Sequence, residues 1–170
     1  MFRRNCCGVQ RLNLDCILTR RPDAIAEIIG SSEYPDITGT AEFYQTQMGT
    51  LVVTEVSGLP ESDDLCMSPV FGYHIHSGQF CTGNSEDAFA DTDGHYSIDE
   101  CRHPYHTGDM PPLFGSQGYA FSIFLSGRFS VCEIIGRTVI IHLNPDDFYT
   151  QPSGNSGAKI ACGMIEKISR

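Results

Sequence analysis

The chain has 170 residues, of which 41% are hydrophobic, so a single domain with a sizeable core is expected. The formal net charge of -10 argues against a surface that binds nucleic acid and against one that binds an anionic membrane. Five of the 11 basic residues but only one of the 21 acidic residues precede Pro22. We therefore expect a basic N-terminal extension, residues 1–22, followed by an acidic domain, residues 23–170.

The extension opens with Arg3 and Arg4, as a secretory signal would. Polar residues interrupt every apolar run that follows, however, and there is no small-residue cleavage site. No segment approaches the length of a membrane-spanning helix. We expect a poorly ordered extension and a cytoplasmic protein.

The sequence from Asp23 onward is typical of strands and turns. It contains 17 Gly and 9 Pro without a long helical period. Strand-like runs occupy the ranges 24–29, 39–45, 50–56, 70–76, 119–125, 138–142 and 158–168; several of them alternate apolar and polar residues, whereas 138–142 is an apolar run that ends in a histidine. Met48 and Gly49 indicate a hairpin turn between the second and third of these runs. Short strands with regular turns predict an all-β fold, an antiparallel sandwich or barrel.

Two long segments, residues 77–110 and 144–157, are expected to contain almost no regular structure. Loops of this length are uncommon inside a compact domain, and function or metal binding is the usual reason for them. We therefore expect the functional residues in and beside these two loops.

Five of the six histidines lie between Gly72 and Asp109. His74 and His76 are two residues apart in an extended run, so their side chains leave the same face about 7 Å apart. The next three histidines fall in a segment with no apolar period, which metal ligation would order. A single histidine on a strand is more often a packing residue, but two clusters joined by one chain indicate two neighbouring metal sites.

Taken in order, the motifs resemble those of the Cu/Zn superoxide dismutase family over residues 24–168. The matching pieces are His74-Ile75-His76, Gly94-His95-Tyr96, His106-Thr107-Gly108-Asp109, residues 136–142, Asp146-Asp147 and residues 154–163. The resemblance implies an eight-stranded antiparallel Greek-key barrel with long metal-binding and active-site loops. It also implies that the protein converts superoxide to oxygen and hydrogen peroxide.

The resemblance assigns all six histidines as metal ligands. Copper would be bound by His74, His76, His95 and His142, and zinc by His95, His103, His106 and Asp109. His95 would be shared as an imidazolate that takes up a proton and delivers it to the peroxide. Zinc would fix this bridge and its loop, and Asp146 would orient one histidine of each set.

Two positions depart from the family pattern. Only Pro104 and Tyr105 separate His103 from His106, where the family usually has a longer insert, and Cys101 could compete as a zinc ligand. Lys159 stands where many members have an arginine that guides superoxide to copper. Lysine keeps the positive charge but lacks the planar fork that holds an anion by two hydrogen bonds.

The eight cysteines are too dilute for a secreted disulfide framework. The resemblance implies one disulfide, between Cys81 and Cys162. We interpret Cys6, Cys7 and Cys16 as free thiols rather than a metal site, because no fourth ligand lies nearby. Cys66, Cys101 and Cys132 have no obvious partner.

The sequence is to be explained by one of three functions. The first is a copper- and zinc-dependent superoxide dismutase, and the alternative is a catalytically weak or inactive dismutase-like protein that binds the two metals. Loss of a copper histidine would mark the alternative, and all four are present. A purely structural β-sandwich would have scattered histidines. The family includes monomers and dimers built on different faces, so a homodimer remains one open expectation.

Overall fold

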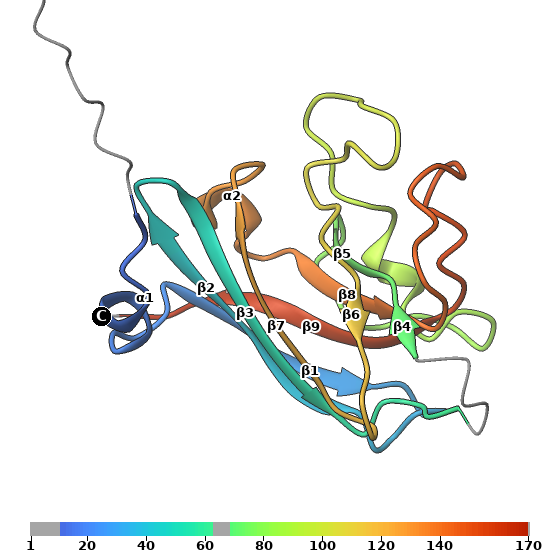
Figure 1. Ribbon diagram of the computed structural model, residues 1–170. Helices are drawn as coiled ribbons and strands as arrows, with labels where there is room; N and C mark the ends of the chain where they lie inside the picture. The colour runs from blue at the N-terminus through green and yellow to red at the C-terminus, as the bar shows by residue number, and fades with distance from the viewer. Residues whose placement is uncertain (1–10, 63–68, 170) are drawn as a thin grey trace, which may run out of the picture.

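The computed structural model describes residues 11–62 and 69–169, and it is mostly β. Seven antiparallel strands form one curled sheet in the order β5-β8-β9-β1-β2-β3-β7, and β4 pairs with β6 beside it (Figure 1). The strands are β1 Ala24–Gly30, β2 Thr38–Thr46, β3 Gly49–Ser57, β4 Val70–Phe71, β5 Tyr73–His76, β6 Leu113–Phe114, β7 Ala120–Ser126, β8 Thr138–His142 and β9 Lys159–Lys167. The described helical segments are α1 Leu14–Leu18, the 3-10 turn η1 Ala90–Thr92 and α2 Val131–Ile134. None of these helices is long and apolar enough to span a membrane.

The all-β prediction is confirmed, and six of the seven predicted strands have a counterpart within about two residues at either end. The predicted strand 70–76 is divided at Gly72 into β4 and β5, which belong to different sheets. The sheet differs from an evenly closed eight-stranded barrel at β6, which is only two residues long. Pro111 and Pro112 come directly before β6 and have no N–H to donate to a neighbouring strand. β7 lies at the edge of the seven-stranded sheet, a half-barrel that is consistent with the Greek-key barrel of the resemblance.

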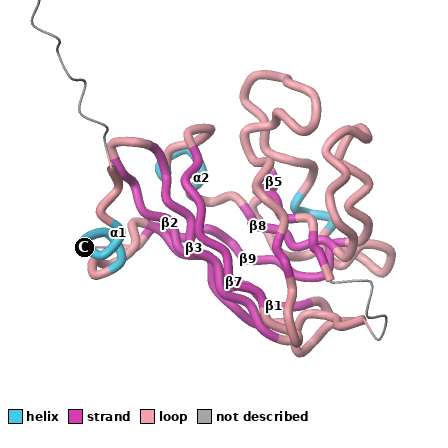
Figure 2. The backbone as a smooth tube through the Cα atoms, in the orientation of Figure 1, coloured by secondary structure: helices cyan, strands magenta, loops and turns pink. Residues whose placement is uncertain are grey.

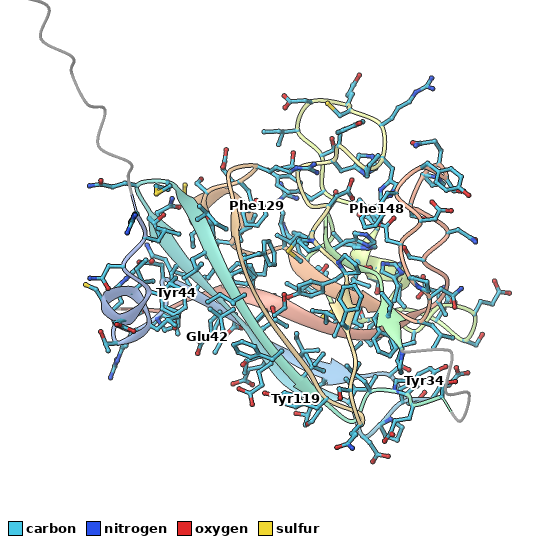
Figure 3. All side chains as sticks on the ribbon, viewed as in Figure 1. Tyr34, Glu42, Tyr44, Tyr119, Phe129 and Phe148 are labelled. Atoms are coloured by element: carbon cyan, nitrogen blue, oxygen red, sulfur yellow. A yellow bond between two sulfur atoms is a disulfide. The ribbon has the colours of Figure 1, made fainter. Side chains whose placement is uncertain are left out.

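The part of the N-terminal extension that the structure describes is more regular than expected. α1 begins after Asn13, whose side chain accepts a hydrogen bond from the Cys16 N–H at 3.1 Å. Arg20 joins this segment to the domain, because its guanidinium lies 5.3 Å from the centroid of the Tyr44 ring and bonds the carbonyl of Gln45 at 2.9 Å. Tyr44 lies at the end of β2 opposite the loops that contain Phe148 (Figure 3).

Alternating side chains show which face of the curled sheet is its inner face. In β1, Ala24, Ala26 and Ile28 are buried while Glu27 is exposed. The inner faces of β3 and β5 meet although these strands are not neighbours in the sheet, since the hydroxyls of Thr54 and Tyr73 lie 2.9 Å apart in the core. The curled sheet thus encloses one hydrophobic core.

The long loops gather at one side of the sheet, beside β5 and β8 (Figure 2). Within residues 77–110 the structure contains η1 and isolated bridges but no regular strand, as the sequence predicts. α2 was not predicted; Ser130 and Glu133 form a capping box at its start. The loops leave the outer face of β5 and β8 as the floor of the candidate site.

Candidate metal centre

Strand register places three histidines on the outer face of the sheet. His74 and His76 alternate along β5 with Tyr73 and Ile75, which point into the core. β8 runs antiparallel to β5, and its register with β9, its other neighbour, shifts between Ile141 and His142. This arrangement brings the Nε2 atoms of His76 and His142 to 3.2 Å from one another.

His95 and Asp109 are positioned by backbone hydrogen bonds along the other edge of β5. Isolated bridges pair His76 with His95 and His74 with Asp109. The Tyr96 N–H donates to the Ile75 carbonyl at 2.8 Å, and the Ile75 N–H donates to the Gly108 carbonyl at 2.9 Å. Both side chains are therefore fixed next to the histidines of β5.

Two groups of four donors result, and within each group the candidate ligand atoms lie within 4.8 Å of one another. We name them the strand cluster, His74, His76, His95 and His142, and the loop cluster, His95, His103, His106 and Asp109. The structure brings together every residue that the sequence assigned to each metal. His95 belongs to both groups, which makes the two sites neighbours.

The strand cluster contains two nitrogen lone pairs that face each other. The Nδ1 atom of His76 bonds the Asp93 carbonyl at 2.8 Å, and that of His142 bonds the Gly157 carbonyl at 3.2 Å. A carbonyl oxygen can only accept, so each Nδ1 is protonated and each Nε2 has a free lone pair. Neither Nε2 can donate to the other, and a cation is the partner that satisfies both.

Asp146 connects the two clusters. Its Oδ2 accepts a hydrogen bond from His74 Nε2 at 2.7 Å and its Oδ1 accepts one from His103 Nε2 at 2.9 Å. The Nδ1 atoms of both rings are left buried without a hydrogen-bond partner. Gly154, at φ +66°, is required here because a Cβ would clash with Asp146 Oδ1.

The loop cluster converges on Asp109. Its Oδ1 bonds His95 Nδ1 at 2.7 Å, while the Nδ1 atoms of His103 and His106 lie 3.2 and 3.3 Å from Oδ2 without forming hydrogen bonds. His95 Nε2, on the other side of its ring, is also buried and unpartnered. Three imidazoles and one carboxylate are a donor set that suits zinc, whereas four imidazoles suit copper.

Burial keeps the rings of His74, His76 and His142 neutral. It lowers the pKa of His74 to about 4 and that of His142 to about 3, and it holds the pKa of His76 well below the usual value. Burial also raises the pKa of Asp146, but hydrogen bonds from His74, the Phe148 N–H and His103 outweigh it and lower this pKa to about 2. At neutral pH the rings therefore offer lone pairs, as metal binding requires.

The predicted disulfide is confirmed: Cys81 and Cys162 are bonded, with their Cα atoms 5.6 Å apart. Cys16, Cys101 and Cys132 are free and exposed. Cys101 lies outside both clusters, so the structure does not support it as a zinc ligand. Cys6, Cys7 and Cys66 lie outside the described residues.

Lys159 does not extend freely toward the site. Its Nζ donates to Asp87 Oδ2 at 2.8 Å and to the Phe89 carbonyl at 3.0 Å. Burial raises the pKa of Asp87, but the hydrogen bond from Lys159 outweighs it and keeps this carboxyl ionised. The guiding role of Lys159 stays a prediction, and Asp87, which sequence reasoning missed, offsets its charge.

Sequence reasoning also missed three side chains that support the ligands through backbone carbonyls. The guanidinium of Arg137 lies 3.6 Å from the centroid of the Tyr96 ring, next to His95, and donates to the Ser77 carbonyl at 3.1 Å. Arg128 and Gln151 contact the segment that contains His103 and His106. A contact with a backbone carbonyl requires no particular residue on the other side, so no motif signals it.

Comparison with known proteins agrees with this geometry. The sequence model of the family described as "Copper/zinc superoxide dismutase (SODC)" matches residues 37–165. The superoxide dismutase [Cu-Zn] of Deinococcus radiodurans is 30% identical over 151 residues, which cover 78% of this chain and 79% of that protein. The Legionella pneumophila protein of the same name is 30% identical over 152 residues, 85% and 87% of the two chains. The crystal structure of a double mutant of a SOD-like protein from Bacillus subtilis superposes with a TM-score of 0.67 at 25% identity, covering 82% of this chain and 94% of that one.

Proposed function

The chain belongs to the copper/zinc superoxide dismutase family, and we propose that it binds copper in the strand cluster and zinc in the loop cluster and dismutates superoxide. Two superoxide ions and two protons give one O₂ and one H₂O₂, with one electron passing from the first superoxide to the second. Copper, when bound, supplies the redox couple for this transfer, and zinc, which has no redox chemistry, supplies positive charge.

The observation that carries the proposal is the pattern of hydrogen bonds around the rings. Four histidines use one ring nitrogen on a carbonyl or carboxylate outside the centre, and their second nitrogen is left inside it. Such outer acceptors fix the tautomer and orientation of metal-binding histidines in proteins. Histidines that merely pack in a core would have no reason to leave buried nitrogens unpaired.

The shared ring of His95 is the best placed group for proton delivery. Its Nδ1 faces Asp109 in the loop cluster and its Nε2 faces the strand cluster. To serve both clusters, the ring must release the Nδ1 proton that it now shares with Asp109. Nε2 is then the atom at which a proton for the departing peroxide would be held.

Metal content measured together with activity tests the proposal. We expect one copper and one zinc per chain after reconstitution, by elemental analysis, and superoxide scavenging that requires copper. The zinc-only protein is the control and should be inactive. Failure to bind copper, or stoichiometric copper without activity, would contradict the enzyme assignment.

The second of these outcomes would favour a weak or inactive dismutase-like metal-binding protein. One observation supports that alternative: the loop of residues 144–158 contains no Lys or Arg, and Lys159 is paired with Asp87. Attraction of an anionic substrate would then be modest. The presence of all four strand-cluster histidines supports the enzyme.

A further inference from the structure

The loop cluster depends on a segment that has no strand to hold it. Residues 97–107, which we name the ligand loop, leave the edge of β5 after Tyr96 and return at Gly108. In the described part of the chain, the backbone-to-backbone hydrogen bonds of this loop are local, such as Tyr105 N–H to the Arg102 carbonyl at 2.8 Å. His103 and His106, which the loop contains, therefore need support from side chains.

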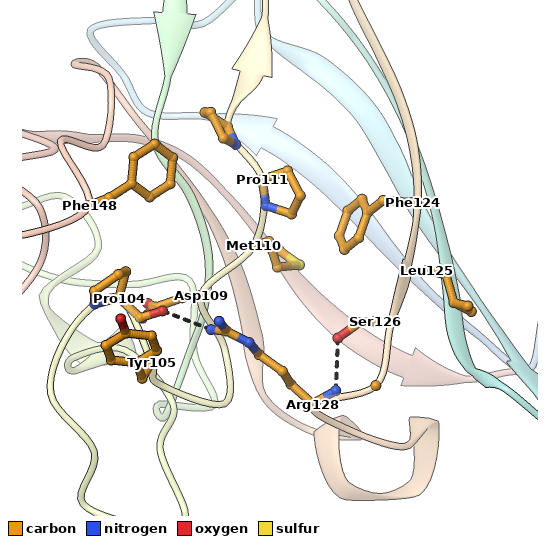
Figure 4. A pocket seen from close by; sticks show the side chains of 12 residues that line it. Pro104, Tyr105, Asp109, Met110, Pro111, Phe124, Leu125, Ser126, Arg128 and Phe148 are labelled. Atoms are coloured by element: carbon orange, nitrogen blue, oxygen red, sulfur yellow. Dashed lines mark hydrogen bonds between the residues drawn. The ribbon is translucent and has the colours of Figure 1, made fainter.

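Arg128 supports one side of the loop. It follows β7, and its side chain extends toward Pro104 and Tyr105 (Figure 4). Its Nη1 donates to the Pro104 carbonyl at 2.8 Å and to the His106 carbonyl at 3.0 Å. These carbonyls lie on either side of Tyr105, and one of them belongs to a loop-cluster residue. One guanidinium nitrogen thus holds these two carbonyls near each other, and this fixes the path of the backbone between His103 and His106.

Gln151 supports the other side. Its Oε1 accepts from the His103 N–H at 3.1 Å, and its Nε2 donates to the His103 carbonyl at 2.7 Å. The side-chain amide thereby pairs with both backbone groups of one residue, as a neighbouring strand would. Gln151 comes from the loop that also contains Asp146, which orients the His103 ring.

We propose that Arg128 and Gln151 are positioning residues that preorganise the loop cluster for zinc. The inference rests on the proposed function for the identity of the metal. It goes beyond that function by assigning the support of a short loop to two side chains that contact no metal. They replace the order that a longer, self-supporting insert would provide.

Whether zinc binding weakens or tightens when Arg128 is removed distinguishes a positioning role from an electrostatic one. Arg128 is a positive charge near a cation site, so its removal should tighten zinc binding if charge alone mattered. Loss of positioning has the opposite effect, because the loop must then be ordered during binding. Arg102 is an exposed arginine in the ligand loop whose side chain forms no hydrogen bond among the described residues, which makes it a matched control.

The experiment uses the full metal-free chain with its disulfide intact. Zinc affinity is measured by competition with a chromophoric chelator, and cobalt(II) absorption reports whether the site is four-coordinate. We expect Arg128→Met and Gln151→Met each to weaken zinc binding by about 10-fold and to lower the cobalt(II) absorption. Arg128→Lys should weaken it less, and Arg102→Met should leave it unchanged or tighten it.

Copper binding by the same variants separates positioning from a general loss of folding. Copper affinity should stay within about 3-fold of the parent, because strands rather than the ligand loop hold three of the four histidines. Unchanged zinc affinity in both Met variants, or equal losses of copper and zinc affinity, would overturn the inference. A parent chain that binds no zinc would instead overturn the proposed function.

Discussion

The two halves of the metal centre are held by different kinds of structure. In the strand cluster, three histidines lie on β5 and β8, and the register of the sheet determines how far apart they are. In the loop cluster, His103 and His106 lie on a loop whose outside support comes from single side chains. Sheet register is shared by a cooperative core, whereas a side-chain hydrogen bond can be lost alone. The strand cluster should therefore tolerate changes that the loop cluster does not.

Removing one ligand from each half gives the largest expected effect. His142→Ala should lower copper affinity and dismutase activity by at least about 100-fold. Removing a ligand should cost more affinity than removing a group that only orients a ligand. His106→Ala should lower zinc affinity by a similar factor and leave copper at one per chain. Elemental analysis and superoxide scavenging measure both. Equal loss of both metals in both variants would mean that the halves form one cooperative unit and are not held separately.

The disulfide tests whether the sheet also holds the start of the long loop. Cys81 and Cys162 are 81 residues apart, and replacing both by serine should lower the free energy of unfolding by about 4 to 5 kcal/mol in the chain-entropy treatment. Denaturant unfolding of the metal-free protein measures this change. Cys132→Ser, which removes an exposed free thiol, is the control and should be neutral. A change below about 1 kcal/mol would mean that other contacts hold the loop.

The same contrast explains which parts of the fold could be predicted. Strands with one buried and one exposed face, such as β1, show alternation in the sequence, and β8 is a plain apolar run that ends in His142. β6 has two residues and α1 has five, too few to show any period. The edge position of β7 is a feature of the strand order, and no local pattern in the sequence indicates it.

The ligands could be predicted because all six histidines of the chain fall at the spacings of known motifs. The groups that orient these ligands could not be predicted. His76 is oriented by the carbonyl of Asp93 and His142 by that of Gly157, and a carbonyl is present at every position of the chain. The pairing of Lys159 with Asp87 joins residues 72 positions apart, and no motif connects them.

Asp146 is the next target, because it bonds one histidine of each half. Asp146→Asn replaces one acceptor oxygen by an NH₂ group, which cannot accept a hydrogen bond from a ring N–H. We expect zinc affinity to fall by about 10- to 100-fold and copper affinity by less, since β5 still positions His74. Chelator competition measures both affinities. Asp147→Asn is a suitable control, because Asp147 bonds the nearby Thr150 and lies outside both clusters. Equal losses for the two metals would contradict the separation of the halves.

The smallest expected effect concerns the approach of superoxide to the strand cluster. Lys159 is the cation that the family pattern places there, but its Nζ is bonded to Asp87, so the carboxylate cancels part of its field. Asp87→Asn should raise the second-order rate by about 2- to 5-fold and make that rate fall more steeply with added salt, because an unopposed lysine attracts the anion and salt screens the attraction. Lys159→Met should lower the rate and flatten its salt dependence.

Glu86→Gln is the control, because it removes the same charge from the adjacent, exposed residue. It distinguishes an effect of the Lys159–Asp87 pair from an effect of the protein's net negative charge. If Glu86→Gln raises the rate as much as Asp87→Asn does, the pairing of Lys159 with Asp87 has no special role. If neither Asp87→Asn nor Lys159→Met changes the rate or its salt dependence in fully metal-loaded protein, Lys159 does not guide the substrate.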